Sequence, residues 1–256
     1  MISLGIQFIY VPILNFYKIG VNYKMKKITL GLVLLLVMCC FTACGKNNAS
    51  NDIIEEIQQT LNPNDEQVQI AFGNDHYAKK TLLLSSRLHS EGLIALCTNP
   101  EPLSLDNGVI QDWFKEAFER TELTSEQQVQ IAKMGNVIYT KSLLQSTQLT
   151  GEGLIAICEN PGNLPLDFVQ NLFNEAMERT ELTPEQEVKI AKLGKRTYNT
   201  ALLWRTNLSA DGLAAICENP EILPLQNPTF KKMFNEVVER IELNAEKEVK
   251  ITESLN

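Results

Sequence analysis

Residues 153–161 read Gly-Leu-Ile-Ala-Ile-Cys-Glu-Asn-Pro, and the chain contains two near-copies of this stretch, at 92–100 and at 212–220. The cysteines of the three copies, Cys97, Cys158 and Cys217, are 61 and 59 residues apart. A second motif, Glu-Arg-x-Glu-Leu, recurs at Glu119–Leu123, Glu178–Leu182 and Glu239–Leu243. Self-similarity at a fixed period indicates a repeat architecture, in which each unit buries its apolar face against its neighbours.

The repeated part is predicted to cover residues 52–256. Its units lie at about 62–122, 123–181 and 182–242, and a half unit at 243–256 copies the start of a fourth. The helices expected at Asp52–Leu61 and Asn244–Leu255 would cap the two ends of the array. The period is longer than the tetratricopeptide, ankyrin and HEAT periods, so the repeat does not correspond to one of these families.

Each unit is predicted to hold three helices. In the second unit the first helix starts after Thr124 and runs to about Leu144, and Gly135 inside it is interpreted as a point of close helix contact. The second helix starts after Thr150 and stops before Pro161. The third carries an apolar stripe, seen in the three units at Ile110, Trp113, Phe114, Ala117 and Phe118, at Val169, Leu172, Phe173, Ala176 and Met177, and at Phe230, Met233, Phe234, Val237 and Val238.

No segment shows sustained strand alternation with turn signals. The fold class predicted from the sequence is therefore all-α, with tandem three-helix repeats of about 60 residues in a solenoid-like array.

The N-terminal part has a different composition. Met25-Lys26-Lys27 precedes sixteen uncharged residues, Ile28–Ala43, and this pattern is typical of a secretory signal peptide. The run is shorter than the about twenty apolar residues of a spanning helix. Residues 1–24 do not fit a signal and are interpreted as an upstream over-extension, with an extra membrane segment as the alternative.

The leader ends in Phe41-Thr42-Ala43-Cys44-Gly45, which resembles the lipobox of bacterial membrane lipoproteins, except that Phe41 stands where that family usually has Leu. The resemblance implies cleavage before Cys44, acylation of Cys44 as the membrane-lipid anchor, and a tether over residues 44–51. It also implies a membrane-anchored, extracytoplasmic place in the cell envelope. Gly45 is not the Asp associated with inner-membrane retention, which favours the outer membrane in a Gram-negative source.

Removing the leader changes the charge balance. The chain carries −8 over 256 residues, but residues 1–43 hold four lysines and no acid. Without those four lysines, 19 basic residues stand against 31 acidic ones, a net charge of −12. This argues against nucleic acid as a partner, because a basic face would be needed to neutralise phosphates.

The residues able to carry chemistry form no catalytic or metal-ligating pattern. Cys39 and Cys40 lie in the leader, while Cys97, Cys158 and Cys217 share one repeated position and are predicted to be buried core residues. His89 is expected to cap a helix, and His76 lies thirteen residues before it. No cofactor, metal or catalytic residue is predicted.

Two further sets of residues recur in every unit. Glu and Arg repeat at Glu119 and Arg120, Glu178 and Arg179, and Glu239 and Arg240. Ion pairs between helices, with the arginines near negative helix ends, are the favoured interpretation. Tyr77, Tyr139 and Tyr198 are expected to lie in the core or to line a groove.

The third unit departs most from the repeat. Trp204 aligns with Leu83 and Gln145, and together with Arg196 and Arg205 it is predicted to form a partner surface. The function favoured by the sequence is a lipid-anchored, non-enzymatic envelope protein that acts as a scaffold for an unknown protein partner. The alternatives are an acidic inhibitor or immunity-type lipoprotein, a cell-wall hydrolase that uses a carboxylate pair, and a structural spacer.

Overall fold

The computed structural model describes residues 48–166 and 169–241, and every regular element in these residues is helical. Residues 1–43, Cys44, the half unit 243–256 and the expected cap Asn244–Leu255 lie outside the described residues. The elements are α2 (Asn48–Thr60), α3 (Glu66–Phe72), α4 (His76–Leu84), α5 (Ser90–Thr98), α6 (Gly108–Arg120), α7 (Ser125–Lys133), α8 (Val137–Gln145), α9 (Gly151–Glu159), α10 (Gln170–Arg179), α11 (Pro184–Lys192), α12 (Arg196–Trp204), α13 (Ala210–Cys217), the short 3₁₀ helix η3 (Pro220–Ile222) and α14 (Pro228–Arg240). The all-α repeat array predicted from the sequence is confirmed.

The number of helices in a unit differs from the prediction. The expected helix from Thr124 to Leu144 is two helices, α7 and α8. Gly135 lies between them with φ of +63°, a left-handed conformation that glycine adopts without steric cost. Asn136 then caps α8, because its side chain accepts from the backbone N–H groups of Ile138 and Tyr139. Gly135 therefore ends a helix instead of lying inside one, and each unit has four helices.

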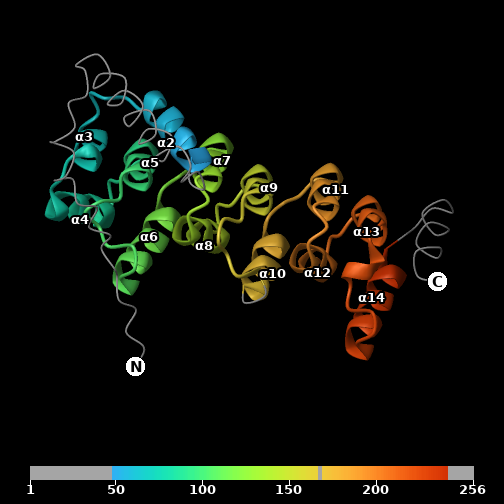
Figure 1. The fold of residues 1–256 in the computed structure, drawn as a ribbon. Helices are drawn as coiled ribbons and strands as arrows, with labels where there is room; N and C mark the ends of the chain where they lie inside the picture. The colour runs from blue at the N-terminus through green and yellow to red at the C-terminus, as the bar shows by residue number, and fades with distance from the viewer. Residues whose placement is uncertain (1–47, 167–168, 242–256) are drawn as a thin grey trace, which may run out of the picture. The chain divides into compact units, whose positions relative to one another are not determined.

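The helices of the array are arranged in two layers (Figure 1). The odd-numbered helices α3 to α13 form one layer, in which α7 packs on α9 within a unit and α9 packs on α11 of the next unit. The even-numbered helices α4 to α14 form the other, in which α6 packs on α8 and α10 packs on α12. One period of about 60 residues thus contributes two helices to each layer.

The apolar stripe predicted for the third helix of the sequence-based unit is confirmed. In α6 the stripe residues Ile110, Phe114, Ala117 and Phe118 are buried, and so are the corresponding Val169, at the N-cap of α10, and Phe173, Ala176 and Met177 within α10. Phe114 and Phe118 lie beside Tyr139 of α8, with ring centroids 5.2 and 6.4 Å away. The stripe therefore packs in the core of its own unit and also against the next unit.

The helices α5, α9 and α13, which carry the Gly-Leu-x-Ala motif, are apolar on all sides. Nearly all of their residues are buried, as expected for a helix with neighbours in its own layer and in the other one. The N-caps predicted for them are confirmed: the side chains of His89, Thr150 and Ser209 accept from backbone N–H groups of the first turn.

The expected N-terminal cap is placed differently. α2 begins at Asn48, four residues before the predicted start and inside the predicted tether, and Figure 1 draws it beside α5 and α7. Its Ile53, Ile57 and Thr60 line a cavity together with Gln130 and Lys133 of α7. In the described residues α2 does not pack extensively on α3 or α4, and its Ile53 and Ile57 lie near α7 of the second unit.

Among residues 48–166 and 169–241, no helix is long and apolar enough to cross a membrane.

The loops after α7 and α9 meet at a pair of glycines, which gives a test of the packing. Gly162 has φ of +59°, and a Cβ added to it would overlap the carbonyl oxygen of Gly135. We expect Gly162→Ala to lower the free energy of unfolding by about 2–4 kcal/mol, from left-handed strain and overpacking together. Chemical denaturation measures the loss.

Gly194→Ala is the matched control. Its φ is +62°, but a Cβ there meets nothing within 4 Å, so only the conformational cost of about 1–2 kcal/mol should appear. Equal losses in the two variants would contradict the close approach of the two loops.

Candidate functional site

The repeated arginines cap helix ends. Arg179 of α10 donates from Nε to the carbonyl of Ser146 at 3.2 Å and also donates to the carbonyl of Leu144. Arg120 makes the same pair of bonds to Ser85 and Leu83, and Arg240 donates to the carbonyl of Arg205. The guanidinium groups therefore lie at negative helix ends, as predicted, but they donate hydrogen bonds to backbone carbonyls at the ends of α4, α8 and α12.

The repeated glutamates bind the loop of the next unit. Glu119 of α6 accepts from the backbone N–H of Thr147 at 2.9 Å and from its hydroxyl at 2.6 Å. Glu178 of α10 binds Thr206 in the same way, at 2.8 and 2.6 Å. The hydrogen bond from the threonine hydroxyl is the main cause that lowers the pKa of both carboxyls. They are ionised at neutral pH and are poor proton donors.

The loops after α8 and α12 are consequently each held from two sides. The loop between α8 and α9 receives Glu119 from the first unit and Arg179 from the second. Glu119 reaches from the first unit into the second, whereas Arg179 binds within the second unit, so the glutamate of the motif joins neighbouring repeats. This accounts for its presence in every unit without a reaction centre.

A third repeated position, which the sequence reasoning missed, fixes the start of α5, α9 and α13. Gln128 accepts from the backbone N–H of Thr150 at 2.9 Å and donates to the carbonyl of Gln148 at 2.9 Å. Gln67 makes the equivalent bonds to His89 and Arg87. In the third unit Glu187 takes this position and accepts from the N–H of Ser209.

The third unit contains a buried ion pair at this position. Glu187 is 1% exposed and Arg205 5% exposed, and Arg205 Nε lies 3.2 Å from Glu187 Oε1. Arg205 also donates to the carbonyls of Thr180 and Met177. The sequence held a signal for the pair, because Glu187 and Arg205 depart together from the Gln128 and Ser146 of the second unit.

The prediction that Arg205 belongs to a partner surface is therefore wrong, because its guanidinium is used in the core. The other two members of that set are exposed, and Trp204 is 56% exposed. Arg196 is the first residue of α12 and Trp204 the last, about 12 Å apart along the helix axis. The predicted set of three does not come together as one patch.

The structure also corrects the alignment at Trp204. Trp204 is the ninth residue of α12, and the ninth residues of α4 and α8 are Leu84 and Gln145. Leu84, and not Leu83, is therefore the counterpart of Trp204, and it is 43% exposed. Two of the three units thus present a large apolar side chain at the same place on the even-numbered layer.

Two of the three repeated tyrosines lie in the core, which is one of the two predicted locations. Tyr139 and Tyr198 are fully buried, and their rings lie 5.2 and 5.0 Å from those of Phe114 and Phe173. Tyr77 is 77% exposed and lines a cavity, whereas Ala78 holds the position that corresponds to Tyr139. The aromatic cluster is missing there, because in the described part of the chain no preceding helix packs on α4 as α6 packs on α8.

The cysteines and His89 have structural roles. Cys97, Cys158 and Cys217 are buried free thiols, as predicted, and burial raises the pKa of each, that of Cys217 to about 12. Such thiols are poor nucleophiles. His89 accepts from Gly92 N–H through Nδ1, and its Nε2 lies 3.3 Å from Asp65 Oδ2. Within the described residues no group of three or more His, Cys, Asp or Glu side chains is arranged to hold a metal ion.

Comparison of the chain with protein-family models, with curated proteins and with solved structures found no match.

The buried ion pair can be tested by transplanting the second unit's residues into the third. Glu187→Gln and Arg205→Ser introduce what Gln128 and Ser146 provide in the second unit. Each single change leaves one buried charge without its partner and should cost about 3–5 kcal/mol of unfolding free energy. The double variant should lose less than either single one, because Gln can still accept from Ser209 N–H.

A double-mutant cycle in chemical denaturation measures this coupling. Losses that simply add in the double variant would show that the two residues do not stabilise each other's burial.

Proposed function

We propose that this chain is a lipid-anchored protein of the cell envelope whose helical array binds another protein. The proposal that the array binds another protein rests on Trp204, a large aromatic side chain that is 56% exposed at the end of α12. Tryptophan is enriched among the residues that dominate binding energy at protein interfaces. Leu84 at the same position of the first unit extends the apolar character to a second place on the even-numbered layer.

The use of the repeated polar residues supports a scaffold. The Glu, Arg and Gln positions that recur in each unit are bound to backbone groups of neighbouring helices. Their recurrence is explained by the assembly of the array, so it does not require a substrate. A repeat array of this kind gives an extended surface to a partner.

The proposed anchor is the acylated thiol of Cys44, by resemblance of residues 41–45 to the lipobox. Two or more acyl chains would hold the protein stably at an extracytoplasmic membrane surface, because each buried methylene contributes about 0.8 kcal/mol. In the sequence, Gly45, Lys46 and Asn47 separate Cys44 from the first residue of α2.

Two of the alternative functions make predictions that differ from those of a scaffold. An acidic inhibitor or immunity-type lipoprotein would use the charge of −12 on residues 44–256 to attract a basic partner, and its association rate would fall with added salt. A hydrolase with a carboxylate pair would need one carboxylic acid that stays protonated near neutral pH. Glu119 and Glu178, whose pKa values are lowered, do not suit that role.

The anchor is tested by Cys44→Ala with metabolic fatty-acid labelling. We expect the variant to lose the acyl label and its stable membrane attachment, while Cys40→Ala in the leader keeps both, since only Cys44 follows the lipobox-like residues. A Cys44→Ala protein that remains acylated and membrane-bound would refute the anchor.

The partner surface is tested by Trp204→Ala in cells, with crosslinking and identification of the captured protein. We expect capture to fall about tenfold or more, because truncation of an interface tryptophan commonly costs 2 kcal/mol or more. The melting temperature should be unchanged, since the ring is exposed. Gln145→Ala, at the same position of α8, is the matched control. Undiminished capture, or loss of the fold, would refute this role of Trp204.

A further inference from the structure

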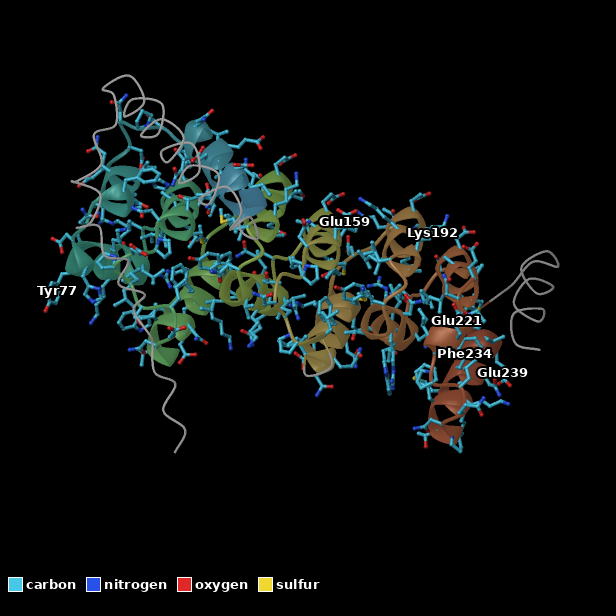
Figure 2. All side chains as sticks on the ribbon, in the orientation of Figure 1. Tyr77, Glu159, Lys192, Glu221, Phe234 and Glu239 are labelled. Atoms are coloured by element: carbon cyan, nitrogen blue, oxygen red, sulfur yellow. The ribbon has the colours of Figure 1, made fainter. Side chains whose placement is uncertain are left out.

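The first unit leaves open a face that the other units cover. Ile70, Ala78 and Thr81 are partly or fully exposed, whereas their counterparts are buried. Those counterparts are Ile131 and Ile190, Tyr139 and Tyr198, and Ser142 and Ala201. We call Ile70, Tyr77, Ala78, Thr81, Ser86 and Arg87 the α4 face; five of them line a cavity of about 490 Å3, and Ser86 is exposed between Ser85 and Arg87 of its rim. Figure 2 shows Tyr77 at this end, pointing away from the neighbouring helices.

The interior junctions show what kind of element fits such a face. α6 lies on α8, and α10 lies on α12. At the first junction Phe114 and Phe118, four residues apart, surround the ring of Tyr139. The next residue, Glu119, accepts from the N–H and hydroxyl of Thr147, and Gln148 donates to the Glu119 carbonyl at 2.7 Å.

The α4 face keeps the corresponding polar groups. Ser86 holds the position of Thr147 and offers the same pair of donors, a backbone N–H and a hydroxyl. Arg87 holds the position of Gln148 and carries a donor side chain. Both are exposed. The main difference is Ala78 in place of Tyr139, which leaves room for a larger side chain of the occupant.

We propose that the α4 face binds an amphipathic helix of another protein in the way that α8 binds α6. The helix would place two large apolar residues, four apart, over Ala78 and Thr81, and a carboxylate directly after the second one on Ser86. Continuity with the two interior junctions carries the proposal, because the same helix packing already occurs twice in the chain. The site is separate from Trp204 and does not depend on the lipid anchor.

The probe is a peptide of residues 106–122, which contains α6, held helical by a staple between positions 112 and 116. Both positions are exposed in the array. Fluorescence anisotropy would follow its binding to the detergent-solubilised full chain. We expect saturable binding that Thr81→Glu weakens at least tenfold, because a carboxylate would then face the apolar stripe. Gln145→Glu, on an exposed position of α8, should leave binding unchanged.

A second measurement checks the polar contact. Glu119→Gln in the peptide and Ser86→Ala in the chain should each weaken binding, and together they should weaken it by about threefold less than the product of the two effects, because they remove the same hydrogen bond. Binding that does not saturate, or that Thr81→Glu leaves unchanged, overturns the proposal. A self-associated chain that the peptide converts to monomer would also overturn it, since the occupant would then be a second copy.

Discussion

The need to satisfy the ends of short helices governs this structure. An α-helix leaves four N–H and four C=O groups without partners inside it at its two ends. Helices α7, α8 and α9 have nine residues each, so their unsatisfied end groups are a large share of all their backbone groups. In a two-layer array these ends are partly buried, and an unpaired buried group costs about 1–3 kcal/mol. Side chains must therefore form hydrogen bonds with the unpaired backbone groups at each helix end.

The repeated polar residues meet this need. Arg179 binds carbonyls at the end of α8, and Gln128 binds the N–H that opens α9. Glu119 binds the loop between these two helices from the preceding unit. The stability of the array therefore depends on each unit's neighbours as well as on its own core. A single unit would keep the bonds of Arg179 and Gln128, which lie within the second unit, but it would lack the bond from Glu119.

The units differ in two places: the third unit has other residues at the repeated Gln position, and the first unit lies at the start of the array. In the third unit the neutral Gln128 type of contact becomes a buried ion pair, and Arg205 takes bonds inside the core that Ser146 does not make. In the first unit a buried lysine, Lys79, replaces the Thr140 and Asn199 of the others. It donates to the carbonyls of Asn99 and Glu101, and burial lowers its pKa. In the part of the chain that the structure describes, no preceding helix packs on α4 as α6 packs on α8, and Tyr77 of α4 is exposed.

The sequence by itself determined the repeat, its all-α class, the N-caps and the buried cysteines, because these follow from the period, from apolar spacing and from local capping. It misplaced the helix break at Gly135, since a glycine inside a helix and one that ends it look alike when apolar residues continue on both sides. Tertiary structure alone decided that Tyr77 is exposed and that Glu119 binds Thr147. The physical reason is that these outcomes depend on which helix of a neighbouring unit lies against a residue, and spacing along one chain does not encode that contact.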